Sequence, residues 1–143
     1  MAIDFEFEDP ILYRQRAILS YSQTCHDWHI VAISTKPFWA GLVDFEVNTD
    51  DWNKELLRRS YPFPIVVGST AYALRHSRVI AAELGHLERI RIYRVEFDIS
   101  TWDILVDRLQ QPAPCMEYLD INYRATDSFT FPPNLFAGDA PRL

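Results

Sequence analysis

The densest cluster of reactive side chains in this sequence is the run Cys25-His26-Asp27-Trp28-His29. It could ligate a metal ion, or the Cys25 thiol could act as a nucleophile with a histidine as its base. A closed metal site needs four ligands, and no second close pair is present; nothing fixes the spacing to the remaining candidates, Cys115, His76 and His86. We therefore predict a polar loop here, with Cys25 half-buried, leading into a strand at Ile30.

The segment Gly68-Ser69-Thr70 is placed where an anion could bind. It lies between an expected strand, Ile65 to Val67, and the expected start of a helix. Backbone N–H groups and the helix dipole at such a junction can hold a phosphate or pyrophosphate, although an ordinary N-cap is the simpler interpretation. The glycine-rich fingerprints of phosphate-binding loops, GxGxxG and GxxxxGK[ST], are absent from the sequence.

Two pairs of carboxylates stand two residues apart. Asp44 and Glu46 form one pair, and Glu96 and Asp98 form the other. If both segments are strands, each pair lies side by side on one face, as general acid–base catalysis would require. The interpretation we prefer is that each pair belongs to a solvated outer face of a strand.

The segment from Ile90 to Ile99 predicts a strand most clearly. Tyr93, Val95 and Phe97 alternate with charged residues, which is the pattern of a half-buried strand. A capping box, Ser100 to Asp103, and apolar residues at helical spacing predict a following helix to about Gln111.

The remaining elements are predicted from shorter patterns. Helices are expected over Asp50 to Arg59 and from Ser69 or Thr70 to Leu84. Further strands are expected over Ile3 to Glu8, Ile11 to Arg16, His29 to Ser34, Phe38 to Val47 and Met116 to Tyr123. Strands outnumber helices and only one stretch reads as a β-α-β unit. We therefore predict a single α+β domain over 1–143, with a mixed, mostly antiparallel sheet, about three helices and a proline- and aromatic-rich tail, 125–143, packed on it.

Two stretches together resemble compact ADP-ribosyltransferase-like domains. They are Leu12-Tyr13-Arg14 and the run from Ile65 to Asp98, which contains Gly68-Ser69-Thr70 and Ile92-Tyr93-Arg94-Val95-Glu96-Phe97-Asp98. The resemblance implies that the protein binds NAD and transfers ADP-ribose to an acceptor. Its cofactor-binding residues would be Tyr13, Arg14, Ser69, Thr70 and Tyr72, and Glu117 would be the catalytic carboxylate. In such a site the carboxylate stabilises the positive charge that develops on the ribose as nicotinamide leaves.

Composition limits the other classes of function. The 143 residues are 48% hydrophobic and 24% charged, which predicts one folded domain. No apolar run is long enough for a membrane span, and two cysteines without a disulfide framework favour a reducing, cytoplasmic setting. The net charge of −6 argues against general nucleic-acid binding. That charge and the 14% aromatic content support an alternative to the enzyme: an acidic, non-enzymatic binding module of the immunity-protein or antitoxin type that masks a partner protein.

Overall fold

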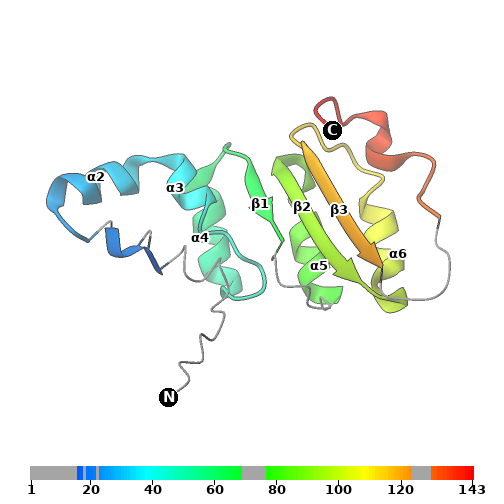
Figure 1. The fold of residues 1–143 in the computed structure, drawn as a ribbon, viewed down its shortest axis with the longest axis horizontal. Coiled ribbons are helices and arrows are strands. Elements are labelled where there is room, and N and C mark those ends of the chain that lie inside the picture. The colour runs from blue at the N-terminus through cyan, green and yellow to red at the C-terminus, as the bar shows by residue number, and fades with distance from the viewer. Residues whose placement is uncertain (1–15, 18, 22, 69–76, 124–129) are drawn as a thin grey trace, which may run out of the picture.

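A computed structural model describes residues 16–17, 19–21, 23–68, 77–123 and 130–143 (Figure 1). Its longer elements, in chain order, are α2 (His26–Ser34), α3 (Lys36–Ala40), α4 (Asp50–Ser60), β1 (Ile65–Val67), α5 (Ser77–Leu84), β2 (Ile90–Phe97), α6 (Ile99–Arg108) and β3 (Tyr118–Tyr123). Two short 3-10 helices, η1 (Leu87–Arg89) and η2 (Leu135–Gly138), complete the described chain.

The sheet is parallel throughout, with strand order β1-β2-β3. Helix α5 lies between β1 and β2 in the chain, and α6 lies between β2 and β3. The two helices pack against each other and cover the same face of the sheet (Figure 1). The prediction of a mostly antiparallel sheet is therefore wrong, and so is the prediction of about three helices. Parallel neighbours need a crossover connection, and both of these crossovers contain a helix.

The wrong sheet prediction comes largely from two segments that were expected to be strands. His29 to Ser34 belongs to α2, and the start of Phe38 to Val47 belongs to α3. A short apolar run fits a strand and a helix equally well, so periodicity alone could not decide. Pro37, in the first turn of α3, fits a helix start because it has no N–H to leave unpaired.

Other predictions from sequence are confirmed. Thr49 caps α4 by accepting a hydrogen bond from the Trp52 N–H, and β2 buries Tyr93, Val95 and Phe97. Helix α6 begins two residues earlier than the expected capping box, because Asp98 is its N-cap and accepts from the Ser100 N–H.

The end of the chain packs beside α6. Phe136 is buried, and its N–H donates to the Leu109 carbonyl at 2.6 Å. The Ala113 N–H donates to the Asp139 carbonyl at 3.0 Å. Residues 130–143 thereby join the described core. Within the described chain, no helix combines the length and apolar character needed to cross a bilayer.

The half-buried His86 gives the first testable prediction. Its ring stacks on Phe45 with 5.8 Å between centroids, and burial lowers the pKa of its imidazole; the negative charge of Glu88 opposes this shift, and the positive charge of Arg89 adds to it. A histidine whose pKa is lower in the folded state takes up its proton more readily when unfolded. The melting temperature should therefore fall as the pH drops below about 6.5. The contribution of His86 to this fall should end once the pH is below the pKa of His86 in the folded protein.

Thermal unfolding of a His86→Phe variant measures this effect. The phenylalanine keeps an aromatic ring against Phe45 but cannot titrate, so its melting temperature should fall less between about pH 7.5 and about pH 5.5 than that of the wild type. His26→Phe, at an exposed position in α2, is the control and should keep the wild-type pH dependence. Equal falls in wild type and His86→Phe would contradict the prediction.

Candidate functional site

Of the six residues predicted to bind NAD or act on it, Glu117 belongs to the described residues. It directly precedes β3, and its side chain is exposed. Its Oε2 lies 3.8 Å from the Arg91 Nε, and its Oε1 lies 3.7 Å from an Arg142 guanidinium nitrogen. The other five residues lie outside the described ranges; they are Tyr13, Arg14, Ser69, Thr70 and Tyr72.

Glu117 and Gly68 stand beside opposite edge strands of the described sheet. Glu117 is level with Arg91, because its N–H donates to the Arg91 carbonyl at the amino end of β3. Gly68, which precedes Ser69, follows the carboxyl end of β1 and lies against Arg94. Arg91 and Arg94 are three residues apart on β2, so Glu117 and Gly68 are about 10 Å apart along the strand direction. Strand β2 also lies between them.

Gly68 makes the closest backbone approach at this edge. Its φ is +121°, and a Cβ on it would lie 2.4 Å from the Arg94 carbonyl oxygen. Position 68 therefore requires glycine. The residue was predicted as part of an anion-binding segment, whereas its described contacts join β1 closely to β2.

The two carboxylate pairs do not form general acid–base pairs. Glu96 is buried, although it was expected on an outer face. Asp98 is engaged at the start of α6, where hydrogen bonds from Ser100 hold the pKa of its carboxyl below the usual range. Asp44 lies in a turn rather than a strand, and its Oδ1 accepts from the N–H groups of Glu46 and Val47.

The Cys-His run also differs from its prediction. Cys25 is the exposed N-cap of α2, and the four residues that follow form the first part of this helix. No three metal-ligating side chains come together among the residues that the structure describes.

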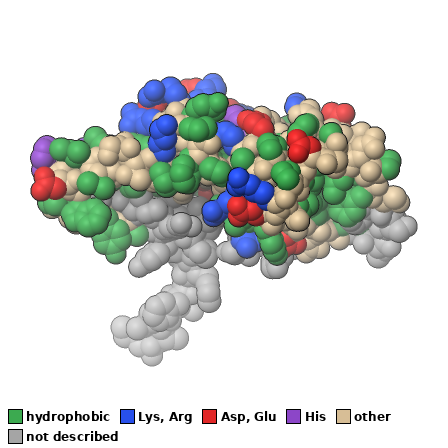
Figure 2. All heavy atoms as spheres, turned by 90° about the horizontal axis from the view of Figure 1, so that it is seen from above, with side chains coloured by type: hydrophobic (Ala, Val, Ile, Leu, Met, Phe, Trp, Pro, Cys, Tyr) green, Lys and Arg blue, Asp and Glu red, His purple; other side chains and the backbone are tan. Residues whose placement is uncertain are grey.

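Helix α2 is the most unusual surface of the described chain. None of its residues is buried. Its large apolar side chains are exposed by 62% at Trp28, 47% at Ile30, 53% at Val31 and 43% at Ile33. The helix projects from the end of the molecule, and hydrophobic side chains gather over that end (Figures 1 and 2). It joins the domain through α3, where the Trp39 Nε1–H donates to the Ile33 carbonyl at 2.8 Å.

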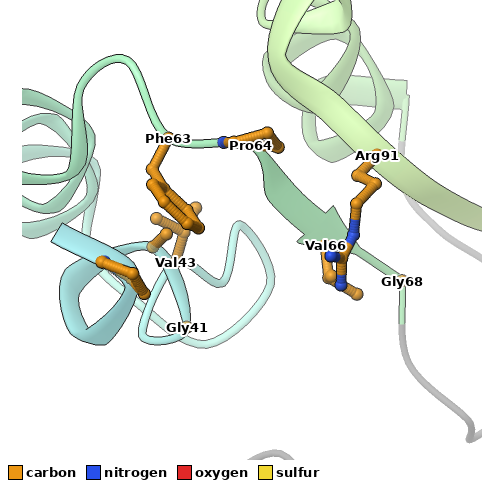
Figure 3. A pocket seen from close by; sticks show the side chains of 9 residues that line it. Gly41, Val43, Phe63, Pro64, Val66, Gly68 and Arg91 are labelled. Atoms are coloured by element: carbon orange, nitrogen blue, oxygen red, sulfur yellow. The ribbon is translucent and has the colours of Figure 1, made fainter. Parts of the chain in front are cut away.

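A groove of about 220 Å³ lies between α3 and β1 (Figure 3). The α3 side consists of small or apolar residues, and Phe63, Pro64 and Val66 form much of the β1 side. Arg91 contributes the charged side chain of this lining and extends beside Val66 in Figure 3. No sequence motif pointed to this groove; β1 was predicted as a strand, but the α3 wall comes from a segment that was also predicted as a strand.

A second hollow, of about 540 Å³, lies between residues 45–50 and α5. Its lining includes Asp50 and Arg78, which form an ion pair at 2.7 Å. Glu46 contributes a further carboxylate to the lining, and no motif of the sequence points to a ligand for this hollow.

Comparisons with protein-family models, curated proteins and solved structures gave no match for this chain. The resemblance to ADP-ribosyltransferase-like domains therefore stays a prediction, together with the NAD-binding roles that it implies.

Proposed function

We propose that this protein is a binding module that docks α2 into a groove on a partner protein of net positive charge. The observation that carries the proposal is the exposure of Trp28, Ile30, Val31 and Ile33 on one short helix. Large apolar side chains on two sides of a helix are normally buried. None of the residues of α2 is buried in the described structure.

The arrangement of the apolar side chains favours a partner that encloses the helix. Trp28 and Val31 are three residues apart and share one side of α2, whereas Ile30 and Ile33 share the opposite side. A flat surface could cover only one of these pairs, but a groove covers both. Covering the exposed part of four such side chains would contribute roughly 4 kcal/mol, at about 1 kcal/mol for each half-exposed residue.

Charge favours a basic protein as the partner. The chain carries a net charge of −6, so two copies repel each other, whereas a basic partner is attracted at long range. This is the masking role expected of an acidic binding module. The NAD-transfer hypothesis relies mainly on residues outside the described ranges, and its one described residue, Glu117, lies near two arginines, Arg91 and Arg142.

Site-specific photo-crosslinking tests the proposal. A photoreactive amino acid replaces Val31 in α2 in one sample and Ile99 at the start of α6 in the control; Ile99 is 66% exposed, more than the 53% of Val31, so a lack of product there cannot be due to burial. In cells that naturally make the protein, we expect position 31 to link to one basic protein and position 99 to give no such product. Equal labelling at both positions, or a product of twice the chain mass, would overturn the proposal.

The purified crosslinked protein then allows an affinity measurement. Trp28→Ser should weaken its binding by about 2 kcal/mol or more, roughly 30-fold, because aromatic anchors dominate such interfaces. Ile99→Ser is the matched control and should bind like the wild type. Calorimetry that finds equal affinities for the two variants would show that α2 is not the docking element.

A further inference from the structure

The groove between α3 and β1 combines an edge strand, an apolar wall and a cation. Among the described residues, β1 pairs with β2 alone, so its other edge has no strand partner there. The groove follows the chain from Phe63 to Gly68, and five residue steps of extended chain span about 16 Å. Val66, in the middle of β1, is exposed. These features suit an extended peptide lying beside β1.

Arg91 provides the charge that distinguishes one ligand class. Among the described residues it forms an ion pair with Glu117, but the 3.8 Å from Nε to Oε2 is longer than a hydrogen bond. Glu117 is shared with Arg142, so the three side chains together carry one net positive charge. The Arg91 guanidinium is partly exposed and has five N–H donors in a planar fork, which matches a carboxylate.

We propose that this groove binds the C-terminal residue of an extended peptide, with an apolar side chain between α3 and β1 and the terminal carboxylate on Arg91. The volume of about 220 Å³ is smaller than sites for drug-sized ligands and suits a side chain. The length of the groove along β1 favours a peptide over a free small carboxylate, because preceding residues can continue along the strand. The inference is independent of the proposed docking of α2, which uses other residues.

Fluorescence anisotropy with two labelled pentapeptides tests the inference. Both have the sequence Gly-Ser-Val-Thr-Leu; one ends in a free carboxylate and the other in an amide. The wild type should bind the free carboxylate at least about tenfold more tightly, because a hydrogen-bonded charge is lost in the amide. Arg91→Gln should remove this preference. Arg78→Gln, at an exposed arginine of the second hollow, is the control and should keep it.

A second variant and a competitor complete the test. Val66→Glu places a negative charge on the groove wall at an exposed position and should weaken the carboxylate peptide by at least about tenfold. N-acetyl-leucine should compete far more weakly than the peptide. The inference is overturned by no binding at millimolar peptide, by equal binding of the two peptides, by a preference that survives Arg91→Gln, or by N-acetyl-leucine matching the peptide. Trp28→Ser should leave peptide binding unchanged, which separates this inference from the proposed function.

Discussion

Replacing Gly68 with alanine is expected to destabilise the protein by about 3 to 5 kcal/mol, which is a large part of the total stability of a typical domain. Two effects add at this position. The φ of +121° is costly for any residue with a Cβ, and the new Cβ would lie 2.4 Å from the Arg94 carbonyl oxygen and 2.7 Å from the Arg94 Cβ. Backbone atoms of β2 cannot rotate away as a flexible side chain can, so β1 and β2 must separate.

Gly138→Ala is a matched control for this prediction. Gly138 also has a positive φ, +72°, but a Cβ there would meet nothing within 4 Å. The free energy of unfolding of this variant should therefore fall by only about 1 kcal/mol, which is the cost of the left-handed conformation for alanine. Urea unfolding of the two variants and the wild type gives both differences. If the two alanine variants lose equal stability, the close approach of Gly68 to β2 contributes nothing.

The parts of the fold that sequence predicts well are those with a long or capped pattern. The strand at Ile90 to Phe97 alternates over eight residues, and α4 follows a capping threonine, Thr49. Their type and position were therefore predictable. The run His29 to Ser34 has neither property. Its apolar residues indicate burial, which led to the prediction of a strand. In the structure these residues lie on an exposed helix.

This failure is also why the candidate functional surfaces were missed. An apolar residue in a sequence is assigned to the core by default, so Val31 carried no sign of a docking surface, and Trp28 stood out only through the high aromatic content. No role was predicted for Arg91 from the sequence, because its place in the groove depends on β1 and α3, which only the tertiary structure brings beside it. Glu117 was predicted in a catalytic role, and its described neighbours, Arg91 and Arg142, were not predictable from spacing.

The second large effect is expected at Arg89, which joins the end of α4 to the start of β1. The residue is buried, and its guanidinium donates to the Leu57 carbonyl at 3.0 Å, the Ser60 hydroxyl at 2.8 Å and the Phe63 carbonyl at 2.7 Å. Leu57 and Ser60 lie in the last turn of α4, where carbonyls lack helical partners. Arg89 therefore supplies donors that the helix end needs.

Arg89→Met should cost about 3 kcal/mol, because buried acceptors lose their partner while methionine keeps much of the volume. Arg89→Lys should lose less, since one ammonium group can still reach part of this set. Arg58→Met is the control: Arg58 pairs with Glu55 at an exposed site, where the expected loss is below about 1 kcal/mol. Urea unfolding measures all three variants.

The pH dependence of the Arg89 effect tests its cause. Burial lowers the pKa of the guanidinium, but arginine starts from so high a value that it stays charged at any pH suited to the measurement. The loss in Arg89→Met should therefore be constant between about pH 6 and about pH 9. If the loss of stability in Arg89→Met changed across this range, another titrating group would support the junction. If the loss were no larger than that of Arg58→Met, water would satisfy the carbonyls at the end of α4. A constant and large loss would identify Arg89 as the residue that fixes Phe63 and Pro64, and with them the β1 wall of the groove.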